Sequence, residues 1–106
     1  MAEIKVTQAG RVAPGTGTVV DANGTAIALF NVGGTFHAIA NACTHVGGPL
    51  GEGKLDGTTV TCPWHGSQFD VTSGQVRMGP ARRPVATYPV RVEGGDVFVE
   101  VKDASS

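Results

Sequence analysis

Cys43-Thr44-His45 and Cys62-Pro63-Trp64-His65 are two short blocks that together contain both cysteines of the chain. Each block offers one thiolate and one imidazole, in the overall pattern Cys-x-His-x16-Cys-x2-His. Two thiolates and two imidazoles can hold a [2Fe–2S] cluster in which two histidines replace two cysteines on one iron. We therefore expect one such cluster, with its metal ligands at Cys43, His45, Cys62 and His65.

Two other interpretations use the same residues. A structural zinc ion also accepts sulfur and nitrogen ligands in a tetrahedron. Zinc fingers, however, usually pair Cys with Cys and His with His, the latter at helical spacing, whereas both blocks here are mixed and lie outside any helical pattern. A single disulfide is also possible, but it would leave the matched histidines unexplained. The cluster is the favoured interpretation, and zinc is the main alternative.

The residues around the blocks favour loops that approach a buried group closely. The segment 46–51 that follows His45 is rich in glycine, and Gly66 follows His65 directly. Glycine permits positive φ and close approach of the backbone. The ligand pattern and these loops closely resemble the Rieske iron–sulfur proteins. In that family a proline-containing loop covers the cluster, and the segment 78–81, with Pro80, is similar to it.

Strand and turn signals dominate the rest of the chain, and helix signals are nearly absent. Asn23-Gly24 favours a tight type I′ hairpin turn, and Gly33-Gly34, Asp56-Gly57 and Gly94-Gly95 separate further apolar runs. Val97, Val99 and Val101 alternate with larger or charged residues, as in a half-buried strand. These patterns predict an all-β protein with many short strands.

The resemblance extends this prediction to a specific architecture. It covers roughly residues 4–102 and implies a Rieske-type antiparallel β-sandwich or barrel, with an inserted cluster-binding subdomain made of two ligand loops. We expect a single domain over residues 1–106, with the cluster-binding part at roughly 41–80. A chain of 106 residues is long enough for one domain with a workable core.

Composition excludes several classes of partner. Charged residues make up 16% of the chain and the net charge is −1, so there is no electrostatic footprint for nucleic acid. The first residues contain no apolar run suited to a signal peptide or a membrane span. With both cysteines assigned to the cluster, no disulfide indicates an oxidising compartment. We expect a soluble, cytoplasmic and monomeric protein.

The resemblance also places five residues around the ligands: Gly47, Trp64, Ser67, Phe69 and Pro80. High-potential Rieske proteins carry an additional disulfide, and Gly48 and Trp64 stand at its two positions. They also carry a Ser and a Tyr that donate hydrogen bonds to the sulfurs; Ser67 matches the Ser, and Phe69 stands where the Tyr would be. Because such hydrogen bonds raise the potential, we expect a potential toward the low end of the Rieske range.

Other single residues have a structural and a functional interpretation. Trp64 is expected as a core residue or half-buried anchor, with a water shield over the cluster loop as the alternative. His37 is expected to be an ordinary polar strand residue. Arg77, Arg82 and Arg83 are expected to be solvated, with a basic docking patch as the alternative. At least one of His45 and His65 is expected to expose an imidazole edge.

The function implied by the resemblance is electron transfer. The chain looks like a Rieske ferredoxin that passes single electrons from a flavin-dependent reductase to a terminal oxygenase of the ring-hydroxylating type, and it is expected to catalyse nothing itself. A complete oxygenase needs further histidines for a mononuclear iron, and only His37 remains. The alternatives are a small Rieske subunit of a larger reductase, such as nitrite reductase, and a zinc-stabilised interaction module.

Overall fold

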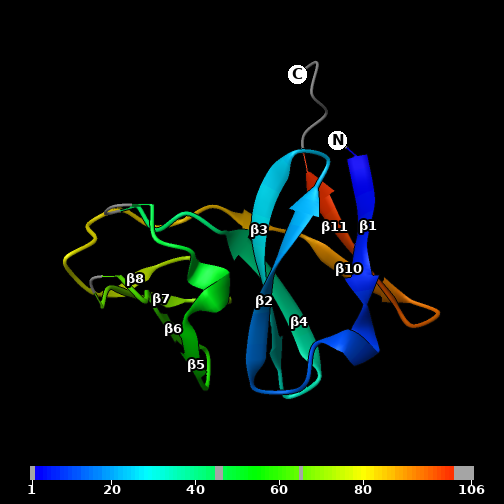
Figure 1. Cartoon of the computed structure of the whole chain (residues 1–106), viewed down its shortest axis with the longest axis horizontal. Helices are drawn as coiled ribbons and strands as arrows, with labels where there is room; N and C mark the ends of the chain where they lie inside the picture. Colours follow the sequence, from blue (N-terminus) through cyan, green and yellow to red (C-terminus); the bar gives the residue numbers. More distant parts are fainter. Residues whose placement is uncertain (1, 45–46, 65, 102–106) are drawn as a thin grey trace.

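A computed structural model describes residues 2–44, 47–64 and 66–101, and this part of the chain is built almost entirely from strands (Figure 1). The elements are β1 (Ala2–Gln8), η1 (Ala9–Arg11), β2 (Thr16–Ala22), β3 (Thr25–Val32), β4 (Thr35–Ala40), η2 (Leu50–Glu52), β5 (Lys54–Asp56), β6 (Thr59–Thr61), β7 (Gln68–Asp70), β8 (Val76–Met78), β9 (Thr87–Tyr88), β10 (Val90–Glu93) and β11 (Asp96–Val101), where η denotes a 3₁₀ helix. Every strand pair is antiparallel. The predicted all-β class is confirmed.

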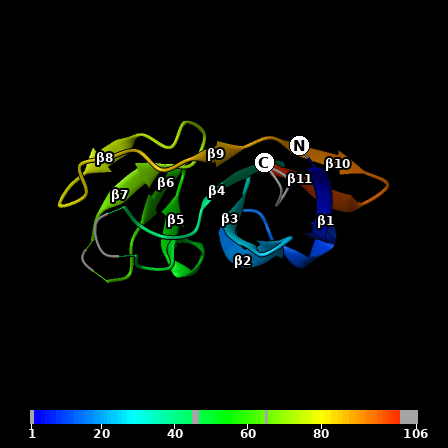
Figure 2. The same ribbon diagram turned by 90° about the horizontal axis from the view of Figure 1, so that it is seen from above.

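The strands form three sheets, with the orders β1-β11-β10, β2-β3-β4-β9 and β5-β6-β7-β8. Figure 2 shows the third sheet as a separate half of the molecule, with β2, β3 and β4 between it and the sheet that contains both ends of the described chain. The part of the chain that contains both cysteine blocks therefore lies at one end of the molecule. We call the half that contains β5 to β8 and the two cysteine blocks the cluster end, and the half that contains the other two sheets the base.

Strand β3 connects the cores of the two halves. Residues 27–30 are all fully buried. Ile27 and Leu29 pack in the core of the base, together with Val97 and Val99, whereas the alternate residues Ala28 and Phe30 pack in the core of the cluster end. Successive side chains of a strand point to opposite faces. The central sheet is thus apolar on both faces, and it joins the two cores.

Most of the predicted turns are confirmed. Asn23 and Gly24 both have positive φ, at 54° and 91°, between the paired residues Ala22 and Thr25. Gly33-Gly34 and Gly94-Gly95 likewise form two-residue turns between paired strands. The turn predicted at Asp56-Gly57 lies one residue later, because Asp56 still pairs with Thr59.

The last hairpin follows the predicted alternation. Val97, Val99 and Val101 are buried, while the residues between them are partly exposed. The outward-facing Phe98 ring carries the Arg91 guanidinium 4.6 Å above its centroid.

In the part of the chain that the structure describes, no helix has the length and apolar character needed to cross a bilayer.

Candidate metal centre

The two cysteines lie in one apolar core at the cluster end. Cys43 is 3% exposed and Cys62 is 2% exposed, and both pack in the group that includes Leu50, Val60 and Phe69. Both thiols are free. The disulfide alternative is therefore not what the structure contains. The sequence spacing predicts that these two residues are ligands, and the fold buries both thiols in the same core.

The two cysteine blocks form loops with the same hydrogen-bond pattern. The Cys43 carbonyl accepts from the Gly47 N–H at 2.8 Å, and the Cys62 carbonyl accepts from the Gly66 N–H at 3.1 Å. Each cysteine N–H then donates to the carbonyl of the residue five positions later, at 2.9 Å for Gly48 and 2.7 Å for Ser67. The glycine four positions after each cysteine has positive φ, 77° at Gly47 and 79° at Gly66, where other residues are strained.

This shared turn is a feature that the sequence reasoning missed. Both glycines had been noted as permissive neighbours of the histidines, but not as equivalent positions. The signal was available as a repeated Cys-x-x-x-Gly, at residues 43–47 and 62–66. The repeat matters because the histidine occupies the third position of one block and the fourth of the other, which hides the common backbone.

The two loops touch each other at Gly48. A Cβ atom placed on Gly48 would lie 2.5 Å from the Cys62 Sγ and 3.2 Å from the Trp64 Cγ. Only a residue without a side chain allows this approach. Gly48 and Trp64 are thus neighbours in space, as expected for the two positions that carry a disulfide in high-potential Rieske proteins.

A third segment is fastened to both loops. The Ala81 N–H donates to the Ser67 Oγ at 3.0 Å, and the Thr44 Oγ1 donates to the Arg83 carbonyl at 2.7 Å. Ser67 is fully buried; its oxygen accepts from Ala81, and its hydroxyl donates no hydrogen bond to another of the described residues. Thr44 had no assigned role in the sequence reasoning, because a threonine in a loop carries no distinctive signal.

The remaining predicted residues have mixed outcomes. Phe69 is fully buried beside the cysteines, and Pro80, after a cis Gly79–Pro80 peptide bond, is exposed. The prediction that Trp64 is a core residue or half-buried anchor is wrong: its side chain is 59% exposed, because it lies across Gly48 on the outside of the loops. His45 and His65 lie outside the described residues, so their ligand roles and the exposed imidazole edge stay predictions.

The donor set fits an iron–sulfur group. Two free thiols lie in an apolar core, and the backbone of Gly48 approaches the sulfur of Cys62 closely. Over the described ranges 2–44, 47–64 and 66–101, no group of three or more His, Cys, Asp or Glu side chains gathers as a metal site. The chain neighbours of His45 and His65 belong to the two loops.

The charged residues nearby have different surroundings. Asp70 accepts hydrogen bonds from the Thr72 N–H and Oγ1 at 2.8 and 2.6 Å, and it pairs with Arg77. Burial alone would raise the pKa of Asp70, but the hydrogen bonds from Thr72 and Arg77 outweigh it and lower the pKa from 3.8 to about 2. Arg82 and Arg83 are exposed.

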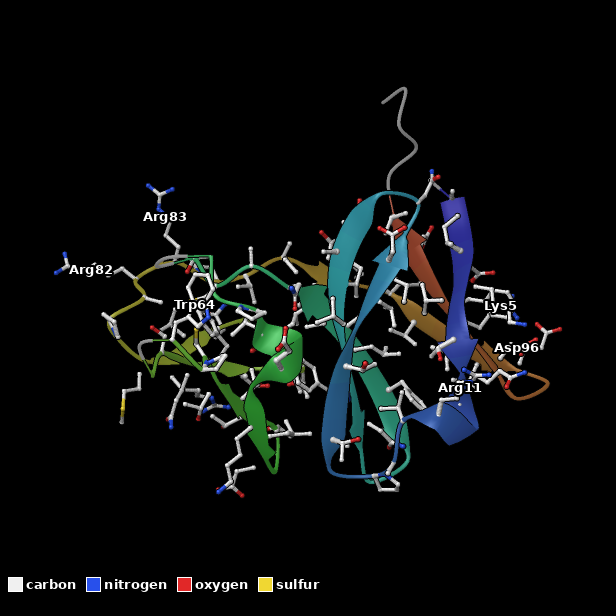
Figure 3. The ribbon with its side chains drawn as sticks, in the orientation of Figure 1. Lys5, Arg11, Trp64, Arg82, Arg83 and Asp96 are labelled. Carbon is white, nitrogen blue, oxygen red and sulfur yellow. The ribbon has the colours of Figure 1, made fainter. Side chains whose placement is uncertain are left out.

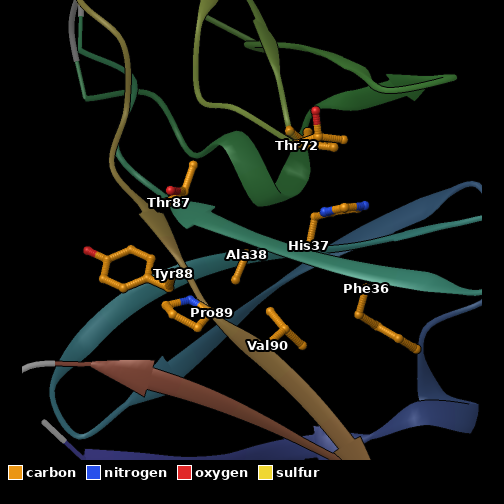
Figure 4. Close-up of a pocket in the computed structure, with 9 residues that line it drawn as sticks. Phe36, His37, Ala38, Thr72, Thr87, Tyr88, Pro89 and Val90 are labelled. Atoms are coloured by element: carbon orange, nitrogen blue, oxygen red, sulfur yellow. The ribbon is translucent and has the colours of Figure 1, made fainter.

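His37 lies away from the cysteine loops. It is a partly exposed residue of β4, opposite Phe30 of β3. With Thr72, Thr87 and Tyr88 it lines an open hollow of about 490 Å³ between the two halves of the molecule (Figure 4). The ordinary strand position predicted for His37 agrees with this placement.

The chain matches a known family model and a curated relative. The family model described as Rieske [2Fe-2S] domain matches residues 2–89. The chain is 48% identical over 79 residues, 74% of each chain, to the 3-phenylpropionate/cinnamic acid dioxygenase ferredoxin subunit of Escherichia coli strain K12.

Two solved structures share the fold over nearly their whole length. The ferredoxin of carbazole 1,9a-dioxygenase from Nocardioides aromaticivorans IC177 is 29% identical, with a TM-score of 0.91 over 96% of this chain and 100% of that chain. A ferredoxin-sized chain from a complex of reduced oxygenase and oxidized ferredoxin in carbazole 1,9a-dioxygenase is 37% identical, with a TM-score of 0.86 over 92% and 91%. The converging cysteine loops, the fold and these similarities together show that the chain belongs to the Rieske [2Fe–2S] domain family.

Proposed function

We propose that this chain is a one-electron carrier that holds one Rieske-type [2Fe–2S] cluster, with Cys43 and Cys62 on one iron and His45 and His65 on the other. A bound cluster of this type supplies a reversible one-electron couple. The cluster-binding part is residues 41–80, roughly, of a single domain that spans residues 1–106. The chain itself contributes no catalytic residue.

The observation that carries the proposal is the pair of matched cysteine loops. Each loop uses its own glycine to close the same turn, and Gly48 brings one loop against the cysteine sulfur of the other. Thiolates in such a position are removed from water. Burial and hydrogen bonding are the means by which a protein sets the potential of an iron–sulfur group.

In this proposal five residues surround the ligands: Gly47, Trp64, Ser67, Phe69 and Pro80. Ser67 is buried with a free hydroxyl hydrogen, which suits donation to a sulfur, whereas Phe69 offers no such donor. High-potential Rieske proteins have two hydrogen-bond donors to the sulfurs, a Ser and a Tyr, and this chain has only the Ser. This supports a reduction potential in the lower part of the Rieske range, which extends from about −150 to +300 mV. Such a potential suits a carrier supplied by a nicotinamide-linked flavin.

The partners follow from the relatives. The Escherichia coli relative is named as the ferredoxin subunit of a dioxygenase, and one structural relative was solved in complex with its oxygenase. By this similarity, a flavin-dependent reductase supplies the electron and a terminal, ring-hydroxylating type oxygenase receives it. With both cysteines assigned to the cluster, no disulfide indicates an oxidising compartment, and the proposal includes a cytoplasmic location.

The carrier is favoured over a nitrite reductase small subunit by two points. All four ligand positions are intact in the sequence, and the relative with 48% identity is a dioxygenase ferredoxin subunit. A zinc-stabilised module would need no match to dioxygenase ferredoxins and would show no redox activity.

Reconstitution tests the proposal. The purified chain is combined with a flavin-dependent reductase, a terminal oxygenase of the ring-hydroxylating type, a nicotinamide cofactor and the aromatic substrate of that oxygenase. We expect product formation to require the chain, and to be lost with Cys62→Ser. Product formed at the same rate without the chain, or electrons accepted from the chain only by a nitrite reductase, would refute the carrier role.

A further inference from the structure

The cluster end carries five exposed residues that the ligand chemistry does not require: Trp64, Met78, Pro80, Arg82 and Arg83. We refer to these residues together as the tip face. Trp64 and Met78, at 59% and 58% exposed, are the most exposed large apolar side chains in the described part of the chain. Figure 3 shows Trp64, Arg82 and Arg83 at one end of the molecule and Lys5, Arg11 and Asp96 at the other.

The tip face concentrates positive charge in a chain whose net charge is −1. No acidic residue occurs between Asp70 and Glu93 in the sequence. Lys5 pairs with Asp96, Arg77 with Asp70, and Arg91 with Glu3 and Glu93. Arg82 and Arg83 have no ion-pair partner among the described residues, and Figure 3 shows both side chains directed away from the body of the protein.

The backbone that carries the arginines is held in place. Thr44 Oγ1 donates to the Arg83 carbonyl, and the Ala81 N–H donates to the buried Ser67 Oγ. Pro80 and Pro84 fix φ on either side of the two arginines. A surface that is already ordered loses less entropy when it binds. These features distinguish the tip face from a loose basic loop.

From these observations, and resting on the proposed function, we infer that the tip face docks on an acidic, partly apolar recess of the terminal oxygenase. Trp64 is the apolar anchor, and Arg82 and Arg83 supply the electrostatic attraction. Tryptophan and arginine are the residues most enriched among interface hot spots, and methionine is also enriched at interfaces. Two free charges are too few for nucleic acid, which would require a longer basic stripe.

The charge contribution is tested with variants matched in net charge. Arg82→Gln/Arg83→Gln and Arg11→Glu each lower the net charge by two, the first at the tip face and the second at the far end, where Arg11 is exposed. Binding of each pre-reduced protein to the oxygenase is measured by calorimetry, and electron transfer by stopped flow, from low to high salt. We expect the double variant to bind about five- to tenfold more weakly at low salt, and the difference to shrink as salt is raised. Arg11→Glu should bind within about twofold of the wild type.

The anchor is tested separately. Trp64→Ala should weaken binding about tenfold or more at all salt concentrations, and Met78→Ala serves as a second apolar probe if Trp64→Ala alters the visible spectrum. Equal effects of the tip and far-end charge variants, or wild-type affinity in both apolar variants, would overturn the inference. So would variants that weaken binding only to the reductase.

Different results would refute the docking inference and the proposed function. If the wild type reduces the oxygenase and the tip-face variants do so with unchanged affinity and salt dependence, only the docking inference is wrong. If the wild type, with an intact visible spectrum, transfers no electron to the oxygenase, the proposed function is wrong as well.

Discussion

Gly48 is the residue at which the two ligand loops depend on each other most directly. Its Cα faces the Cys62 sulfur so closely that an added methyl group would overlap it. We expect Gly48→Ala to separate the loops and to lower the iron content of the purified protein to less than half of the wild-type value, since overpacking of this kind costs about 1–3 kcal/mol. Iron analysis and visible absorbance measure this.

Gly10→Ala is the matched control, because nothing lies within 4 Å of a Cβ at that position. It should retain full iron content. Full iron content in Gly48→Ala as well would contradict the close approach of the two loops.

Ser67 and Phe69 bear on the potential in opposite ways. Ser67→Ala removes the free hydroxyl, and Phe69→Tyr introduces one beside the cysteines. We expect the first to lower the midpoint potential and the second to raise it by tens of millivolts, because about 30 mV corresponds to roughly 0.7 kcal/mol for one electron, within the range of one hydrogen bond. Protein-film voltammetry on the three proteins measures both changes. Shifts in the reverse directions would show that neither hydroxyl interacts with the sulfurs.

At the scale of single residues, the sequence predicted which residues belong to the site better than it predicted how exposed they are. Both cysteines were predicted from their spacing with the histidines, and Ser67 and Phe69 were predicted from the resemblance to the family. Trp64 was placed wrongly because burial of a loop residue depends on the loop opposite it, here Gly48, which no periodic pattern describes. Thr44 was missed because its hydrogen bond reaches Arg83, 39 positions away.

The hairpin of β7 and β8 is stabilised by Asp70. Its lowered pKa means that the folded state favours the carboxylate, so the contribution is complete above pH 3.8, the ordinary value, and is lost as the pH falls toward about 2. We expect Asp70→Asn to cost about 1–2 kcal/mol, allowing for the half-exposed Arg77, and to lower the melting temperature by roughly 5–10 °C.

That cost should be the same at pH 6 and pH 8, because both lie above the titration of Asp70. Thermal unfolding of the wild type, Asp70→Asn and the exposed control Asp56→Asn at both pH values measures it. A difference that disappears between pH 6 and pH 8, or an equal effect of Asp56→Asn, would exclude this role for Asp70.

Among the elements, the long hairpins were predictable and the short strands were not. The turns at Asn23-Gly24 and Gly94-Gly95 have strong local signals, and the alternation of Val97, Val99 and Val101 fixes which face is buried. Strands β7, β8 and β9 have two or three residues each. Such lengths are too short to display a period, so their pairing is determined by tertiary contacts alone.

For the whole molecule, strand β3 is the element that joins the base to the cluster end. β3 contributes alternate side chains to both cores, so the ligand loops are mounted on a sheet that is itself buried on both faces. The sheet arrangement could not be derived from the sequence pattern and came only from the family resemblance. The position of the tip face at the cluster end is also a property of the fold, since its residues come from the second cysteine loop, from the end of β8 and from the segment that follows β8.

The central claim is tested most directly by an anaerobic coulometric titration of the purified chain, followed by its visible absorption. We predict a coloured protein that takes up one electron per chain reversibly, with a midpoint in the lower part of the range from about −150 to +300 mV. A colourless, zinc-containing protein that takes up no electron would contradict the account. A midpoint at the upper end of that range would contradict its assignment to the ferredoxins.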